Sequence, residues 1–490
     1  MICLNTVQRV AKNTSVIIGG DLIFRLVSLV VTIYLARYLG TAGFGKYNFV
    51  FAYLAFFNII TDLGLQTILV REMAREPTRA PKLIGNAYII RWILTTLAVA
   101  SSIIVITWMS YPADTTTYIY IASFTVLFIS FSDFYTTIFS ANLRMEYNIM
   151  AKLVFKALSA GLILLIIFSK GTLMQVMVAL VFSEMVKTLL NYSFSRKFVK
   201  PRFEIDFGLW KYLFKEALPL ALSSVIWIIY FRIDVVMLSM MMGDTEVGLY
   251  SAAYKLSDPL LLIPSALMIS LFPIMSASFK SSEERLIKTY RLSIKYILII
   301  MLPIAIGTTI IADKVILLIY GSEFSGSATA LQILIWALIF ISTSSVLANL
   351  LVSMNKQRLY TISTGICAIT NVILNFFLIP ILSYNGAAIA TVATNIVLFI
   401  ASFYFVSKHL QILPIHRIAI KPVIGGLMMG TFVYYFDVNI FLLIFFAGAV
   451  YLMALLALKT FSEEDFDIIK KLILPTIGKI SIYIGKNKKY

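Results

Sequence analysis

The sequence predicts an all-α integral membrane protein with about 14 transmembrane helices, and three observations lead to this prediction. Hydrophobic residues make up 60% of the 490 residues and charged residues only 13%, whereas soluble domains carry about 25% charged residues. Stretches of about 20 apolar residues, long enough to cross a bilayer as a helix, recur along nearly the whole chain. Lysine and arginine are concentrated in every second polar segment, as expected when successive helices cross in alternate directions.

The apolar stretches define fourteen predicted spans, separated by short polar segments. The weakest of these predicted spans is the one at Val423–Tyr435, because its apolar stretch is short and rich in glycine. The predicted spans are 15–36, 47–70, 84–107, 118–140, 153–169, 173–194, 217–241, 250–273, 292–312, 327–352, 360–380, 387–407, 421–437 and 440–459.

The net charge of +17 follows from this topology and does not indicate a nucleic-acid partner. With a cytoplasmic N-terminus, 32 of the 41 lysines and arginines fall in cytoplasmic segments, five in outer segments and four within spans. This bias is the positive-inside rule, and it predicts that both termini lie in the cytoplasm of a cell membrane. The same cytoplasmic charges would also contact anionic membrane lipids.

Several classes of protein are disfavoured by what the sequence lacks. It contains no Walker A pattern, no nucleophile elbow and no cluster of cysteine and histidine, so we expect no catalysis, no cofactor and no metal site. The two cysteines, Cys3 and Cys367, cannot form a disulfide framework. The loops are short throughout, which argues against a membrane glycosyltransferase with its chemistry in extramembrane loops.

An internal repeat divides the chain. The segment Gly40–Tyr47 and the segment Gly243–Tyr250 both read G-x4-G-x-Y, 203 residues apart. An offset of six helices is even, so two six-helix lobes would cross the membrane in the same direction, with a substrate site between them. The predicted divisions are an N-terminal lobe at 1–200, a cytoplasmic amphipathic linker at 201–216, a C-terminal lobe at 217–410, two additional transmembrane helices at 421–459 and a basic cytoplasmic tail at 460–490.

Charged residues inside the spans are the candidate site, because such charges are costly unless they face a cavity or a partner. Arginine suits a phosphate ligand, since its planar guanidinium binds phosphate oxygens through two parallel hydrogen bonds. A lone buried carboxylate either pairs across helices or takes a proton, as ion coupling requires. Alternatively, pairs such as Asp21–Arg25 only neutralise one another and fix helix packing. The candidates are Arg25, Arg91 and Arg232 for phosphate, and Asp21, Asp62, Asp133 and Asp234 for cavity shape or ion coupling.

Longer motifs resemble a known family. They are Ala36–Tyr47, Phe231–Leu238, Val247–Leu256, Leu318–Phe324 and the stretch from Ile379-Pro380 to Asn385–Thr391. In order and spacing they resemble the polysaccharide-biosynthesis flippases (Wzx-type) of the multidrug/oligosaccharidyl-lipid/polysaccharide (MOP) exporter superfamily.

The resemblance implies a MATE-like fold of two six-helix lobes plus two C-terminal helices. It also implies that a polyprenyl-(pyro)phosphate-linked oligosaccharide is moved to the outer leaflet by alternating access, coupled to H⁺ or Na⁺. A glycan polymerase or glycosyltransferases would then be partners. Two alternatives remain at this point: a cation-coupled multidrug antiporter of the same superfamily, and a non-transporting membrane scaffold for glycan enzymes. Deep arginines argue against the antiporter, and buried charge at mid-depth argues against the scaffold.

Overall fold

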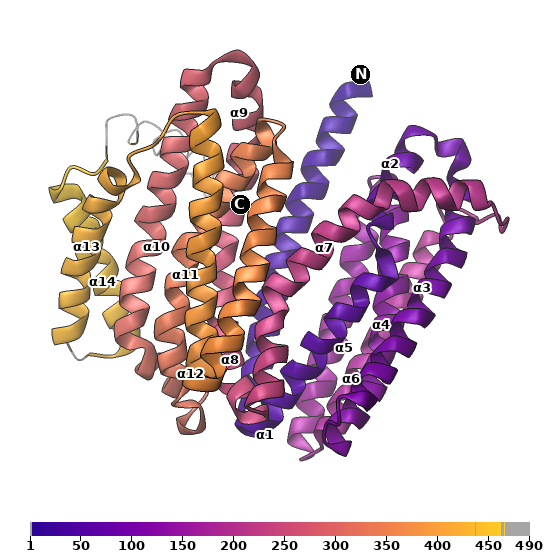
Figure 1. The fold of residues 1–490 in the computed structure, drawn as a ribbon, viewed down its shortest axis with the longest axis horizontal. Coiled ribbons are helices and arrows are strands. Elements are labelled where there is room, and N and C mark those ends of the chain that lie inside the picture. Colours follow the sequence, from indigo (N-terminus) through magenta and orange to yellow (C-terminus); the bar gives the residue numbers. More distant parts are fainter. Residues whose placement is uncertain (1, 437, 462–464, 466–490) are drawn as a thin grey trace, which may run out of the picture. The chain divides into compact units, whose positions relative to one another are not determined.

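The computed structural model describes residues 2–436, 438–461 and 465, with side chains from residue 27 onward. Within these residues the chain is helical and contains no strand, which confirms the predicted all-α class (Figure 1). The predicted tail lies largely outside the described residues. The α-helices are α1 (Ile2–Asp62), α2 (Leu65–Arg75), α3 (Ala80–Trp108), α4 (Ala113–Ala141), α5 (Glu146–Phe168), α6 (Leu173–Ser195), α7 (Phe207–Met241), α8 (Asp244–Ser257), α9 (Leu262–Ser281), α10 (Glu283–Ile319), α11 (Ser327–Ser353), α12 (Gln357–His409), α13 (Ile415–Tyr435) and α14 (Ile440–Ala457), and the 3₁₀ helices are η1 (Pro77–Arg79), η2 (Asp258–Leu261) and η3 (Ser322–Phe324).

Twelve helical stretches in the described part of the chain are long and apolar enough to cross a membrane. Two of them, Val27–Arg75 and Gln357–His409, have 49 and 53 residues, although about 20 residues are enough for one crossing. Each contains a residue with non-helical backbone angles, Gly40 in α1 and Ser383 in α12. Both breaks fall between two predicted spans, and the total of fourteen spans stays a prediction.

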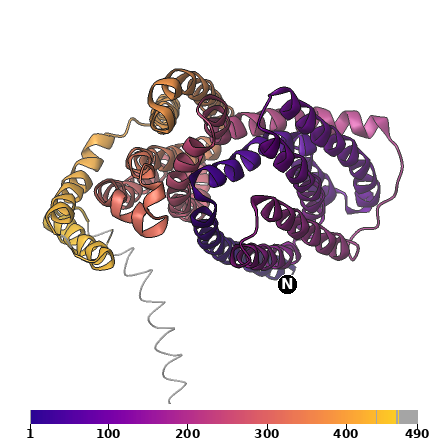
Figure 2. The same ribbon diagram turned by 90° about the horizontal axis from the view of Figure 1, so that it is seen from below.

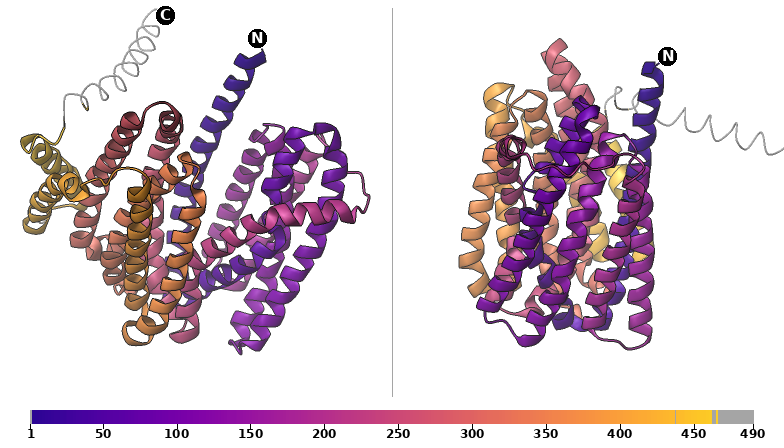
Figure 3. Two further views of the ribbon diagram at one scale, coloured as in Figure 1. Left: turned by 45° about the horizontal axis from the view of Figure 1, so that its top comes forward. Right: turned by 90° about the vertical axis from the view of Figure 1, so that its right-hand side faces the viewer.

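The chain forms two compact units, and each combines segments that are distant in sequence. The first comprises Met1–Leu260, Val315–Leu334 and Arg358–Leu398, and the second comprises Leu261–Lys314, Ile335–Gln357 and Phe399–Tyr490. Within the first unit α4 packs against α3 and α6, and α5 packs against α6 (Figure 3). All of the site residues discussed below that have described side chains lie in this first unit.

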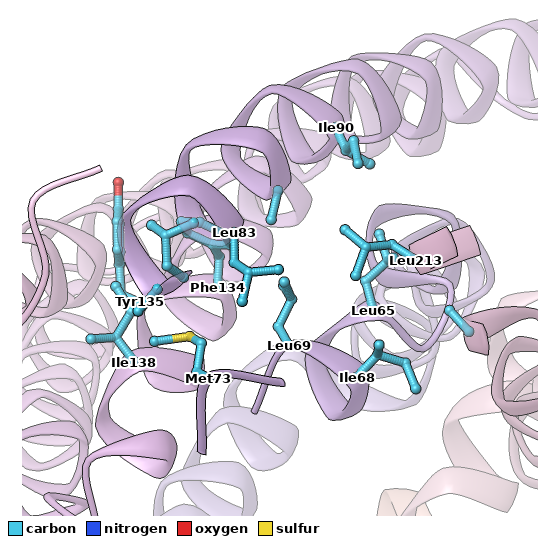
Figure 4. Close-up of a cluster of buried hydrophobic side chains, with 14 of the residues drawn as sticks. Leu65, Ile68, Leu69, Met73, Leu83, Ile90, Phe134, Tyr135, Ile138 and Leu213 are labelled. Atoms are coloured by element: carbon cyan, nitrogen blue, oxygen red, sulfur yellow. The ribbon is translucent and has the colours of Figure 1, made fainter. Parts of the chain in front are cut away.

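Helix α7 joins the amphipathic linker to the membrane span in one continuous helix. Part of the apolar surface of the linker packs within the protein, since Leu213 is buried, whereas Phe203 and Phe207 are exposed. Leu213 and Ala217 are buried against a cluster from α2, α3 and α4 that includes Leu69 and Phe134 (Figure 4). Asp206 precedes the helix, and its carboxylate accepts a hydrogen bond from the Leu209 amide as an N-cap. The first turns of α7 are therefore anchored to α2–α4.

In the second unit, α13 and α14 pack side by side against α10 (Figure 2). The glycine-rich sequence of α13 explains this contact, because a Cβ atom at Gly426 or Gly430 would collide with the Ile306 side chain. Small residues allow membrane helices to approach closely where lipid gives no hydrophobic driving force. The Tyr451 hydroxyl of α14 donates a 2.8 Å hydrogen bond to the Ile299 carbonyl oxygen. The predicted span at Val423–Tyr435 therefore lies in a helix, α13, whose glycines pack closely against α10.

Candidate functional site

The two repeated motifs contact each other directly. Gly45 of α1 lies against the backbone of Asp244, and Gly248 of α8 lies against the backbone of Thr41. A Cβ atom at either glycine would overlap the carbonyl oxygen of the opposite helix. The second glycine of each motif therefore packs against the start of the other motif. Only glycine fits at these two positions, because the two backbones approach so closely.

A third motif, Leu318–Phe324, meets the first motif at the break in α1. The Arg37 guanidinium donates hydrogen bonds of 2.6 and 2.5 Å to the carbonyl oxygens of Ile319 and Leu318, at the C-terminus of α10. These carbonyls have no partner within their own helix, and a cation is favourable there. Glu323 accepts a 2.8 Å hydrogen bond from the Thr41 amide, next to Gly40 at φ 67°. The motifs that suggest the family thus build one helix junction.

An ion cluster borders the same junction. The Lys46 ammonium pairs with Asp114 of α4 and lies 4.0 Å from the Asp244 carboxylate of α8. Nearby, the Tyr111 hydroxyl donates a 3.1 Å hydrogen bond to the Ser239 hydroxyl of α7. One lysine therefore links helices from the two halves of the sequence.

Arg91 and Asp62, predicted for different roles, form an ion pair. The Arg91 Nη1 atom lies 2.8 Å from Asp62 Oδ1 and 2.6 Å from the Thr61 carbonyl oxygen. Asp62 also accepts hydrogen bonds from the amides of Gly64 and Gln66, so it caps the N-terminus of α2. From the sequence, a lone buried carboxylate either pairs across helices or takes a proton. In the structure Asp62 pairs across helices, with Arg91. Arg91 holds the break between α1 and α2.

Asp234 is buried in a network of neutral groups. Its carboxylate accepts hydrogen bonds from Asn375 Nδ2 at 2.5 Å, Thr391 Oγ1 at 3.0 Å and the Tyr250 hydroxyl at 3.1 Å. Among the described residues, no lysine, arginine or histidine pairs with it, and the buried Asn375 Oδ1 has no hydrogen-bond partner. A carboxylate and a free amide oxygen thus lie together without a cation, which is costly in a buried position.

Arg232, two residues earlier on α7, lies in a different environment. It is half-buried, and among the described residues its guanidinium makes no ion pair or hydrogen bond. The charge of Arg232 acts on Lys255 of α8, which is also half-buried and unpaired within the described chain. Lys156 of α5 and Asp258 act on Lys255 as well. The surroundings of Lys255 therefore include two further cations and the acid Asp258, and Glu184 in turn acts on Lys156.

The remaining predicted residues are dispersed. Asp133 on α4 is exposed, and no ion pair of its carboxylate occurs among the described residues. Asp21 and Arg25 lie outside the residues whose side chains are described, so their roles stay predictions. Glu184 and Lys187 on α6 form a buried 2.5 Å ion pair, consistent with the neutralising role considered for such pairs.

Sequence reasoning did not select several residues that complete these sites. Tyr250, Asn375 and Thr391 are neutral and surround Asp234, and no charge marks them in the sequence. Lys156 and Lys255 do carry a signal, because each lies within a predicted span, 153–169 or 250–273. Both lie near the ends of these spans, next to flanking segments in which lysine is common, and this position hides the signal.

A cavity of about 680 Å³ lies where α2, α3 and the start of α7 meet. Its charged groups are paired: Arg79 with Glu76, at 2.7 Å, and Lys82 with Asp206, also at 2.7 Å. The Lys82 ammonium, with the Leu209 amide, holds the pKa of Asp206 below its usual range. The Lys82–Asp206 contact is therefore stable at neutral pH and weakens as the pH falls toward that pKa. With its charges already paired, this cavity is a weaker candidate than the region around Arg232.

These features define a class of protein: a multi-pass membrane protein with the fold of the MOP-superfamily transporters. A solved structure of the lipid II flippase MurJ in an inward closed conformation superposes with a TM-score of 0.75 and 14% identity, covering 89% of this chain and 96% of that one. An inward-facing multidrug resistance MATE family transporter of the MOP superfamily superposes with a TM-score of 0.67 and 17% identity, covering 81% and 95%.

The family follows from the sequence. The family model described as polysaccharide biosynthesis protein matches residues 10–279, more than half of the chain, and the model described as MatE matches residues 219–377. The chain belongs to the polysaccharide biosynthesis protein family.

Two curated relatives come from Haloferax volcanii. The probable low-salt glycan biosynthesis flippase Agl15 is 27% identical over 262 residues, which are 51% of this chain and 55% of that protein. The probable flippase AglR is 29% identical over 191 residues, 38% and 40% of the two chains. The chain therefore spans about half the length of these curated relatives, or less.

Proposed function

We propose that this protein is a flippase for a polyprenyl-(pyro)phosphate-linked oligosaccharide, which it moves from the cytoplasmic to the outer leaflet of the cell membrane by alternating access. Its family and the names of its relatives, Agl15 and AglR, support this substrate class. Both termini would lie in the cytoplasm, as the distribution of lysine and arginine predicts. Glycan polymerases or glycosyltransferases of the same assembly route would be its partners.

The proposal rests mainly on the pair formed by Arg232 and Lys255. Two like charges on neighbouring helices repel each other, and partial burial strengthens this repulsion. The described residues include no ion pair for either group, although Asp258 is within electrostatic reach of Lys255. An anionic ligand that bridges both cations would remove the repulsion, because phosphate oxygens accept hydrogen bonds from both a guanidinium and an ammonium group. Arg25 would join this phosphate site, as the sequence predicts.

The test is a transport assay on Arg232→Gln and Lys255→Gln. We expect each variant to lower transport of a fluorescent polyprenyl-phosphate-linked saccharide in proteoliposomes by about 10- to 100-fold, because a hydrogen bond to a charged group contributes about 1.5–3 kcal/mol. Lys200→Gln removes an exposed lysine outside the helices and serves as the control. Transport at the control level in both site variants would refute the phosphate site. Transport of a cationic drug by the wild-type protein, without flipping of the saccharide lipid, would instead favour the multidrug antiporter.

Asp234 is the residue that we propose for ion coupling. A buried carboxylate without a basic partner must bind a proton or a small cation, or carry a large desolvation cost. The hydroxyl oxygens of Thr391 and Tyr250 and the free amide oxygen of Asn375 are hard ligands that suit Na⁺, and the carboxylate itself can take H⁺.

Asp234→Asn is expected to uncouple transport from the ion gradient while the protein still folds, since an amide is isosteric and neutral. Saccharide-lipid flipping would be measured in proteoliposomes with an imposed Na⁺ gradient and, separately, an imposed pH gradient. Asp313→Asn, at an exposed acidic residue, is the control. Asp133→Asn tests the other predicted coupling residue in the same assay. An unchanged gradient response in Asp234→Asn would exclude Asp234 from coupling.

A further inference from the structure

A second cavity in the first unit, of about 240 Å³, is lined by residues of α1, α4, α5 and α6. It is smaller than the roughly 300–1,000 Å³ of pockets that enclose drug-sized ligands, so it has room for a single small ring. Lys156 of α5, whose charge acts on Lys255, is part of its wall. The cavity therefore lies within electrostatic reach of the proposed phosphate site.

The wall carries hydrogen-bonding groups that have no partner. Ser28 and Thr32 are four residues apart on α1 and so share one face of the helix. In the part of the chain that the structure describes, neither hydroxyl makes a hydrogen bond, and neither do the Tyr47 hydroxyl nor the Lys156 ammonium. Three hydroxyls can donate and accept, and the ammonium can donate three hydrogen bonds. Such a wall is suited to a ligand with several hydroxyl groups.

Three aromatic rings also line the cavity, among aliphatic side chains such as Val31, Ile129 and Leu180. The rings of Tyr47 and Phe51 lie 5.0 Å apart on α1. The Phe155 ring lies under two ammonium groups, with Lys156 Nζ 5.3 Å and Lys187 Nζ 5.0 Å from its centroid. Glu184, which also borders the cavity, pairs with Lys187. An aromatic face beside hydrogen-bonding groups matches a pyranose, which has an apolar C–H face and a polar rim.

We propose that this cavity binds one sugar ring of the lipid-linked glycan, with Tyr47, Phe51 and Phe155 against the ring and Ser28, Thr32 and Lys156 bound to its hydroxyls. This proposal rests on the proposed flippase function and deepens it, because it assigns specificity for the glycan to α1 and α5. A ring linked to phosphate at Arg232 and Lys255 would extend toward Lys156. A lipid tail does not fit a wall with four unpaired polar groups, since its burial would leave them unsatisfied.

The experiment compares two probes on the purified full-length protein in nanodiscs: a polyprenyl monophosphate, and the same polyprenyl monophosphate carrying one hexose. With the bare phosphate, the polar groups of the cavity lack the sugar hydroxyls as hydrogen-bond partners. The wild type should therefore bind the glycosylated probe at least about tenfold more tightly. Tyr47→Phe should reduce this preference about tenfold, equivalent to ~1.4 kcal/mol, without weakening binding of the bare phosphate. Lys156→Met should also reduce the preference, weakening binding of the glycosylated probe more than binding of the bare phosphate. Arg232→Gln should weaken binding of both probes. Leu165→Met, on the exposed face of α5, is the matched control.

The outcomes separate this proposal from the flippase function. An unchanged preference in both cavity variants would overturn the sugar site. Equal weakening of both probes in Lys156→Met would also overturn it, and would assign Lys156 to the phosphate site. If the wild type binds neither probe, the proposed flippase function itself fails. Normal size-exclusion profiles of the variants show that the comparison is made on folded protein.

Discussion

Gly45→Ala and Gly248→Ala are each expected to destabilise the protein by more than ~3 kcal/mol, although alanine is the better helix former. At both positions the added Cβ atom would overlap a backbone carbonyl oxygen, of Asp244 or of Thr41. A backbone atom cannot move aside by changing rotamer, so α1 and α8 must separate. This separation would also disturb the hydrogen bond from the Thr41 amide to Glu323. Thermal unfolding of the purified variants in detergent measures the loss.

Gly161→Ala is the matched control for this pair. Gly161 is also within a helix, but a Cβ atom there meets nothing within 4 Å. The same change should therefore leave stability unaltered or raise it by up to ~1 kcal/mol. If Gly45→Ala or Gly248→Ala proved as stable as Gly161→Ala, the close contact between the two motifs would not be essential to the folded protein.

Asp62→Asn should destabilise the protein by about 3–5 kcal/mol, and more than Arg91→Met does. The side chain of Arg91 is only 4% exposed, whereas that of Asp62 is 30% exposed. Removing the carboxylate leaves a desolvated guanidinium without its counter-ion. Removing the guanidinium leaves a carboxylate that water reaches and that still caps α2 through Gly64 and Gln66. Unfolding of the two single variants and the double variant gives the coupling between the side chains.

The exposed pair of Arg79 and Glu76 gives the comparison for the buried one. Their side chains are 72% and 54% exposed, so Arg79→Met should change stability by at most ~1 kcal/mol. Equal effects of Asp62→Asn and Arg79→Met would mean that burial of the Arg91–Asp62 pair has no energetic consequence. A larger effect for Arg91→Met than for Asp62→Asn would contradict the proposed asymmetry.

The candidate site was predictable only in part. Arg232 and Asp234 are two residues apart on one helix and so point in different directions. The structure places Asp234 in the buried network and Arg232 outside it. For Asp62 the sequence left two possibilities open, a pair across helices or a bound proton, and the structure shows the pair with Arg91. Of the neutral partners of Asp234, Tyr250 and Thr391 lie in the quoted motifs but were not marked as partners of a carboxylate. Asn375 had no signal, because asparagine is an ordinary residue inside a membrane helix.

The sequence by itself determined the class of protein. Hydropathy and the placement of lysine and arginine are properties of short segments, so they reveal the all-α membrane class without knowledge of the fold. The two G-x4-G-x-Y motifs also marked the repeat.

Only the tertiary structure decided the partners of most charges, because these contacts join residues from about 30 to about 280 positions apart, such as Arg91 with Thr61 and Arg37 with Ile319. The two repeated tyrosines illustrate the difference: Tyr250 donates to Asp234, whereas Tyr47 lines the small cavity. Identical motifs acquire different chemistry because the helices packed around them differ.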